Sequence, residues 1–166
     1  MASISRRAGI LTVSDRGSRG LRSDESGRVA RDMLDNAGFT VEQTAVVPDD
    51  PSRIQEVLLE WADKDRLSLI LTSGGTGLSP RDNTPQATQE ILDYEIPGIA
   101  EAMRAAGLSK TPHAMLSRAV AGVRGTSLII NLPGSPRAVR ENLEVVLPAL
   151  HHALDKIEGD PTDCAR

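Results

Sequence analysis

Aromatic residues are scarce in this sequence, since Trp61, Tyr94 and Phe39 are the only ones among 166 residues. The core must therefore be aliphatic, and the aromatic platforms on which single-strand-binding proteins stack bases are missing. Acidic residues outnumber basic ones by 23 to 19, whereas a domain that binds phosphate backbones usually carries a strong basic face. We therefore expect no nucleic-acid partner, although a small anion would need only a few local donors.

Cysteine and long apolar runs are equally rare. Cys164 is the single cysteine, which excludes an internal disulfide and a thiolate metal cluster within one chain. No run approaches the ~18 apolar residues of a membrane span. Residues 1–7 lack the apolar stretch of a signal peptide. We expect no membrane contact and a cytoplasmic location.

The remaining composition, 39% hydrophobic and 25% charged, is typical of a globular domain. The sequence has neither an internal repeat nor a linker that would separate two domains. We predict a single domain over residues 8–157, with a flexible N-terminus at 1–7 and a flexible C-terminal tail at 158–166.

Short apolar runs alternate with segments of helical periodicity along this domain. Strands are predicted at 9–13, 39–47, 68–72, 119–123 and 127–132. Helices are predicted at 26–37, from residue 51, and at 84–92, 98–106 and 136–157, the last with a kink at Pro148. The run at 68–72 is typical of a central parallel strand that is buried on both sides. The pattern predicts an α/β fold, a three-layer α/β/α single domain with a mostly parallel central sheet.

In open parallel sheets, ligands bind beyond the carboxyl ends of the strands. The strongest signal at such an end is a glycine-rich turn made of Thr72, Ser73, Gly74, Gly75, Thr76 and Gly77. Glycines let successive backbone N–H groups converge on an anion, so the turn predicts a phosphate site. Its spacing matches neither the P-loop nor the dinucleotide fingerprint. The structural alternative is a turn that only reverses the chain.

Arg81 and Asp82 follow the turn closely. Arg81 suits bidentate pairing with an anion, and Asp82 suits Mg²⁺ as an oxygen ligand. The alternative is that Asp82 or Thr84 caps a helix in which Pro85 is the first residue.

Two further loops at strand ends carry polar side chains. Asp49 and Asp50 follow the strand at 39–47, where they suit Mg²⁺ together with Asp82 or the hydroxyls of a ribose; the alternative is a turn carboxylate that caps the next helix. Ser14 and Asp15 begin a polar loop after the first strand, which suits a closing lid or a solvated loop.

The last loop supplies Pro133, Gly134 and Ser135 just before a helix, where a second anion or a polar ring could dock. Its alternative is a tight strand-to-helix turn. Upstream, Ser117 precedes Arg118, which is either a second anion partner or a surface arginine.

Covalent acyl transfer is not expected, because the sequence offers no convincing Ser-His-Asp set and no nucleophilic cysteine. Phosphoryl-type chemistry instead needs positioning, Mg²⁺ and charge stabilisation, all of which the predicted loops could supply.

Taken together in chain order, these motifs resemble the molybdopterin-binding proteins of molybdenum cofactor synthesis, from Ala8 to Asp155. The motifs that carry the resemblance are Ser14-Asp15-Arg16, Asp24-x-Ser26-Gly27, Pro48-Asp49-Asp50, Thr72 to Gly77 with Arg81-Asp82-x-Thr84-Pro85, Ser117-Arg118 and Asn131 to Pro136.

The resemblance implies a homotrimer of α/β subunits whose active members are molybdopterin adenylyltransferases. These join AMP from Mg-ATP to the molybdopterin phosphate and release pyrophosphate. Asp49 and Asp82 match the acidic positions of adenylyl transfer and Mg²⁺ binding. The turn from Ser73 to Gly77 would hold the nucleotide, and Ser117, Arg118 and the loop 133–135 would hold the pterin and its phosphate.

Many relatives carry an acidic residue after Thr-Pro, where this chain has Gln86. The family also contains paralogues of doubtful catalytic role, so a non-catalytic molybdopterin carrier and a trimeric scaffold are the alternatives. An adenylyltransferase would pass its product to a molybdate-inserting protein.

Overall fold

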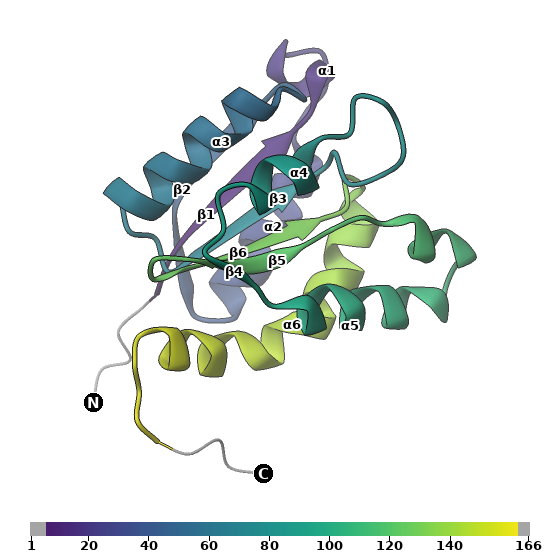
Figure 1. Cartoon of the computed structure of the whole chain (residues 1–166). Helices are drawn as coiled ribbons and strands as arrows, with labels where there is room; N and C mark the ends of the chain where they lie inside the picture. The colour runs from purple at the N-terminus through teal and green to yellow at the C-terminus, as the bar shows by residue number, and fades with distance from the viewer. Residues whose placement is uncertain (1–5, 163–166) are drawn as a thin grey trace.

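The computed structural model describes residues 6–162 as one six-stranded sheet flanked by helices (Figure 1). The strands are β1 (Arg6–Val13), β2 (Phe39–Val47), β3 (Leu69–Ser73), β4 (Tyr94–Glu95), β5 (Ala121–Arg124) and β6 (Ser127–Leu132). The helices are α1 (Asp15–Ser18), α2 (Glu25–Asn36), α3 (Pro51–Leu59), the π-helical η1 (Glu60–Lys64), α4 (Thr84–Gln89), α5 (Pro97–Leu108), the 3-10 helix η2 (Pro112–Leu116) and α6 (Pro136–Ile157).

The strand order is β2-β1-β3-β6-β5-β4, and the first four strands of this order run parallel. Strands β5 and β6 form an antiparallel hairpin across the turn at Gly125, and β4 adds an antiparallel edge. The predicted mostly parallel sheet is therefore confirmed. The prediction did not include β4, because the exposed pair Tyr94 and Glu95 carries no apolar alternation.

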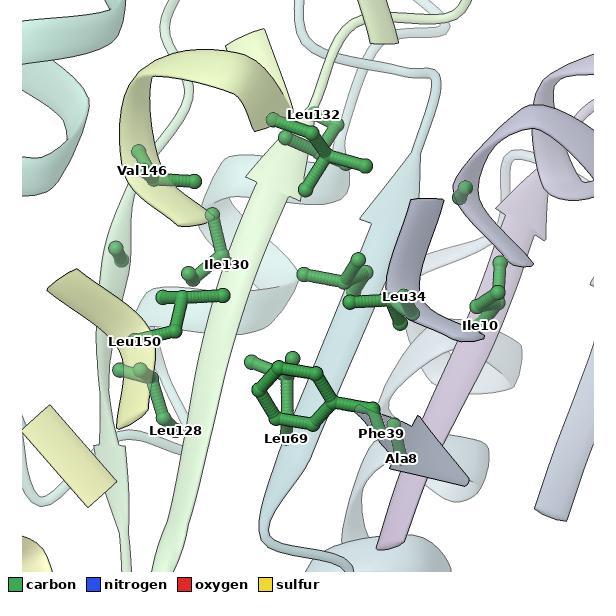
Figure 2. Packing of buried hydrophobic residues seen from close by; sticks show 14 of the residues in the cluster. Ala8, Ile10, Leu34, Phe39, Leu69, Leu128, Ile130, Leu132, Val146 and Leu150 are labelled. Carbon is green, nitrogen blue, oxygen red and sulfur yellow. The ribbon is translucent and has the colours of Figure 1, made fainter. Parts of the chain in front are cut away.

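Helices cover both faces of the sheet. Along β3, Leu69 and Leu71 face the cluster that contains α2, α5 and α6, whereas Ile70 faces the cluster that contains α3, η1 and α4. Every residue of β3 is buried, as expected of a central strand. Figure 2 shows the first cluster, in which aliphatic side chains fill the space around Phe39.

The long helix α6 begins and ends where the sequence predicts, and it continues through Pro148 without interruption. Strand β1 begins earlier than predicted, at Arg6. Arg6 pairs with Asp155 and Arg7 pairs with Glu42, so residues 6 and 7 are held in the sheet. Of the predicted flexible ends at 1–7 and 158–166, residues 1–5 and 163–166 lie outside the described residues.

None of the helices in the described part of the chain is both long and apolar enough to cross a bilayer.

A buried polar network ties β3, β6 and α4 together behind the glycine-rich turn. The Asn131 side chain donates to the hydroxyls of Thr72 (2.9 Å) and Thr88 (3.0 Å), and it accepts the Val120 N–H (3.3 Å). All of the Asn131 side chain is buried, so each of these bonds replaces one that water would otherwise make.

The network yields a stability prediction. Asn131→Ala leaves the Thr72 and Thr88 hydroxyls without their donor, so we expect a loss of about 3 kcal/mol in the free energy of unfolding, measured by urea denaturation. Asn142→Ala, which truncates a partly exposed asparagine of α6, is the control with a much smaller loss. Equal losses in the two variants would contradict the role assigned to the network.

Candidate functional site

The predicted site residues come from loops that the parallel strands bring to one edge of the sheet. Thr12 of β1 lies beside Ser73 of β3, and Ser73 lies beside Leu132 of β6. The Ser73 hydroxyl donates to the carbonyl of Pro133 (3.0 Å), which joins the glycine-rich turn to the last loop. The loops after β1, β2, β3 and β6 therefore surround one region, as predicted.

The turn after β3 needs glycine at two successive positions. Gly74 and Gly75 have φ angles of 102° and 67°, in the left-handed region that favours glycine. A Cβ at Gly74 would lie 2.3 Å from the carbonyl oxygen of Val13. A Cβ at Gly75 would lie 2.2 Å from Oγ1 of Thr84 and 2.7 Å from Oδ1 of Asp49. The turn thus does more than reverse the chain, because it brings bare backbone against a carboxylate and a hydroxyl.

A cavity lies on each side of this turn. The Gly74 cavity, of about 360 Å³, contains on its wall the predicted residues Ser14, Asp15, Asp49, Ser73, Gly74, Gly75, Gly134 and Ser135. The Gly77 cavity, of about 440 Å³ and largely apolar, contains Thr76, Gly77, Ser117 and Pro133. The first part of the turn therefore lines one space and its last part lines the other, and each space is of a size that suits a small-molecule ligand.

Asp49 is a half-buried carboxylate at the end of β2 whose Oδ1 is inaccessible to solvent. Its pKa is raised to about 6, chiefly by burial and in addition by the nearby negative charges of Asp15 and Asp82. The Arg81 guanidinium opposes this effect only weakly. Raised pKa values of this origin are typical of functional sites.

Arg81 is paired with Asp15 across the mouth of the site. Its Nε and Nη2 donate to the Asp15 carboxylate at 3.0 and 2.8 Å, and Asp15 also accepts the Asp49 N–H at 3.0 Å. The hydrogen bonds from Arg81 are the main reason why the pKa of Asp15 is lowered. Asp15 therefore links the first loop to the loops of Asp49 and Arg81, and Arg81 neutralises the Asp15 carboxylate.

Asp82 and Arg118 support the far end of the turn. The Asp82 carboxylate accepts the Ser79 N–H (2.9 Å), and Arg118 donates to the carbonyls of Gly77 (2.8 Å) and Asp82 (2.7 Å). Arg118 is half-buried, and its guanidinium is held against the turn by these two bonds.

The capping alternative for Asp82 and Thr84 is also wrong. Asn83 is the N-cap residue of α4, Thr84 is its first helical residue and Pro85 follows.

Carboxylate and hydroxyl oxygens are the ligands that Mg²⁺ prefers. The described residues include no group of three or more His, Cys, Asp or Glu side chains arranged around a metal position. Asp49 and Asp82 are nevertheless close enough for the charge of one to act on the other, and Oδ1 of Asp49 has no hydrogen-bond partner among the described residues. This donor set fits a divalent cation whose remaining ligands come from phosphate and water.

Four predicted residues line neither cavity. Thr72 is buried in the Asn131 network, Arg81 and Arg118 bond to neighbouring loops, and Asp82 accepts the Ser79 N–H within its own loop. The sequence reasoning in turn missed several wall residues. In the Gly74 cavity these include Arg22 and Ser23; in the Gly77 cavity they include Met103, Arg104 and Asn142.

The motif Asp24-x-Ser26-Gly27 was a signal for Ser26, whose hydroxyl donates to the Gly134 carbonyl (2.6 Å). Arg104 had no such signal, because the packing of α5 alone places it.

Comparison with known proteins gives matches over nearly the whole chain. The family model described as "Probable molybdopterin binding domain" matches residues 9–152. A molybdopterin adenylyltransferase of Helicobacter pylori (strain ATCC 700392 / 26695) is 40% identical over 92% of this chain and 88% of that protein. Gephyrin of Dictyostelium discoideum is 44% identical over 92% of this chain, which spans only 23% of gephyrin.

The solved structure of the molybdopterin biosynthesis enzyme MoaB from Thermus thermophilus is 57% identical. It superposes with a TM-score of 0.89 over 95% of this chain and 99% of that chain. The fold, the order of the motifs and the family match agree, and the chain belongs to the molybdopterin-binding domain family of molybdenum cofactor biosynthesis.

Proposed function

We propose that this protein is a molybdopterin adenylyltransferase that transfers AMP from Mg-ATP to the phosphate of molybdopterin and releases pyrophosphate. The observation that carries the proposal is the position of the Asp49 carboxylate, which lies against a glycine-rich turn between two ligand-sized cavities. A reaction that joins two substrates requires both of them to meet at one place, and the turn is suited to be that place because it borders both cavities.

The chemistry of the walls supports the binding of one substrate in each cavity. The polar Gly74 cavity, with Arg16, Arg22 and several hydroxyls, suits the nucleotide and its phosphates. The largely apolar Gly77 cavity, which includes Met103 and Ser117, suits the planar pterin. Arg118 acts through the turn, since its guanidinium fixes the carbonyls of Gly77 and Asp82.

In the proposed reaction, an oxygen of the molybdopterin phosphate attacks the α-phosphorus of ATP. One P–O bond forms to the pterin phosphate, the bond to the β-phosphate breaks, and pyrophosphate leaves with its electrons. The Gly74 N–H donates to the Leu132 carbonyl (3.0 Å), so the backbone N–H groups of Gly75 to Gly77 are the ones suited to binding the charge that develops on the transferred phosphate. Asp49 and Asp82 would hold Mg²⁺, which neutralises the charge of the triphosphate.

Asp15 has a separate role in this scheme. It fixes the Asp49 backbone by accepting its N–H, so that the carboxylate of Asp49 stays against Gly75. Gln86 is exposed and lines neither cavity. The glutamine in place of the acidic residue of many relatives therefore changes no residue of the cavity walls.

A homotrimer, a cytoplasmic location and onward transfer to a molybdate-inserting protein remain proposals that rest on the family resemblance. The alternatives of a pterin carrier and a trimeric scaffold predict no adenylyl transfer. Binding calorimetry with ATP and molybdopterin separately distinguishes them: the enzyme binds both, the carrier binds the pterin alone, and the scaffold binds neither.

The transfer itself is tested with Asp82→Asn. We expect the rate of adenylylated molybdopterin formation to fall about 100-fold or more, because a metal-binding charge is lost, while pterin binding is largely kept. Product and pyrophosphate are quantified by chromatography and a coupled assay. Asp32→Asn, which neutralises an exposed carboxylate of α2, is the matched control with unchanged rate. Absence of pyrophosphate from the unmodified protein at saturating substrates would contradict the proposal.

Asp49 gives a prediction on stability against pH. Its folded pKa of about 6 exceeds the ordinary value of 3.8, so the folded chain holds this proton more tightly than the unfolded chain. The contribution to stability is therefore fully present below pH ~4 and is lost as the pH rises through about 6. Asp49→Asn should stabilise the chain by about 1–2 kcal/mol at pH 7.5, after allowance for solvent screening, and by less toward pH 4.

Urea unfolding of the two proteins at several pH values, without divalent cations, measures this difference. A constant difference between pH 4 and 7.5 would contradict the burial of the Asp49 charge. The adenylyl transfer rate should rise as the pH rises through about 6, whereas the stability falls. The reason is that a protonated Asp49 no longer attracts a cation.

A further inference from the structure

Two buried side-chain oxygens in the described part of the chain have no hydrogen-bond partner. They are Oδ1 of Asp49 and Oγ1 of Thr84. Thr84 is fully buried, at 0% exposure, and it is the first residue of α4. Most buried polar atoms in proteins are hydrogen-bonded, so two unpaired atoms in one place indicate a missing partner.

Both oxygens face the same small volume next to Gly75. A Cβ placed on Gly75 would lie 2.2 Å from the Thr84 oxygen and 2.7 Å from the Asp49 oxygen. Any other residue at position 75 would therefore place its side chain where these oxygens converge. The left-handed φ of Gly75 (67°) holds the backbone in this orientation.

The Thr84 hydroxyl has no structural task that the described residues reveal. Asn83 occupies the N-cap position of α4 without a side-chain capping bond, and the attachment of α4 to the turn uses the backbone of Thr84, whose N–H donates to the Gly75 carbonyl (3.2 Å). A valine would fill the same space without an unpaired hydroxyl. An unpaired buried hydroxyl destabilises a fold, so its presence here suggests a gain on ligand binding.

The charges around this volume define what it attracts. Asp49 presents a carboxylate oxygen, and the charges of Asp15 and Asp82 act on it from nearby. A phosphate oxygen placed there would be repelled. Carboxylate and hydroxyl oxygens that converge on one point instead suit a hard divalent cation.

We propose that Thr84 is a further cation-binding residue, whose hydroxyl and Oδ1 of Asp49 together hold the divalent cation, directly or through one of its water molecules. The identity of that cation as the Mg²⁺ of adenylyl transfer rests on the proposed function. The participation of Thr84 does not depend on it.

The backbone of Thr84 is fixed from behind. Its carbonyl accepts the Thr88 hydroxyl (2.8 Å), which in turn accepts from the Asn131 side chain (3.0 Å). Through this chain of bonds, strand β6 sets the position of the first turn of α4. The Thr84 hydroxyl is thus preorganised before the cation arrives.

The test is the affinity for Mn²⁺ alone, measured by electron paramagnetic resonance on the full chain. Thr84→Val keeps the shape of the side chain and removes the hydroxyl, and we expect Mn²⁺ binding to weaken about tenfold. The thermal midpoint Tm without metal should stay equal or rise, because an unpaired hydroxyl has been removed. Thr84→Ser restores the hydroxyl and should restore the affinity.

Ser127→Ala is the matched control, since Ser127 is also fully buried but lies at the end of β6 that is remote from the glycine-rich turn. Its hydroxyl donates to the Leu67 carbonyl (2.6 Å), so this variant should lower Tm and leave Mn²⁺ affinity unchanged. In an Asp49→Asn background, Thr84→Val should weaken binding by much less than tenfold, because both residues act on one ion.

Equal Mn²⁺ affinity in Thr84→Val and the unmodified chain would overturn the proposal, as would a marked fall in Tm of that variant. The unmodified chain is also assayed for adenylylated molybdopterin. Product formation together with an unaffected Thr84→Val refutes the role of Thr84 and leaves the enzyme function standing. Loss of Mn²⁺ binding in Thr84→Val without any product from the unmodified chain supports the role of Thr84 and refutes the function.

Discussion

The approach of bare backbone at Gly74 and Gly75 to the neighbouring loops is the constraint on which the site depends. Gly74 is pressed against the carbonyl of Val13, and Gly75 against Asp49 and Thr84. A side chain at either position would separate β1 from β3 or fill the volume beside Asp49. The parallel pairing of the central strands makes this approach possible, because it ends four strands at one level of the sheet.

Negative charge is the second determinant of the site. Asp15, Asp49 and Asp82 act on one another around the turn, and Arg81 neutralises only the first of them at close range. A polyphosphate entering the Gly74 cavity would therefore need a cation beside Asp49, or the release of Arg81 from Asp15. The mouth of the site is exposed, with 62% of the Arg81 side chain accessible, so such a rearrangement has little packing to disrupt.

The apolar runs were enough to predict the sheet, because strands such as β3 are buried on both faces and helix α6 carries a regular apolar stripe. The loops at the strand ends could be predicted from the same topology. The partners of the charged residues could not be predicted in this way. Arg81 was expected to bind an anionic ligand, but it pairs with Asp15, which is far away in sequence. Arg104 and β4 were missed for the same reason, since tertiary packing rather than local pattern defines them.

Satisfied and unsatisfied polar groups are distributed unevenly in this molecule. Behind the turn, Asn131 is fully buried and bonded to Thr72 and Thr88, as a structural residue should be. At the turn, the pKa of Asp49 is raised and the Thr84 hydroxyl is unpaired, and both features make the folded chain less stable. Helix α4 contains both the bonded Thr88 and the unpaired Thr84, so the unpaired groups cannot be ascribed to a loosely packed region. Their concentration beside Gly75 is what a preorganised binding site requires, since a bound cation would supply the missing partner for both.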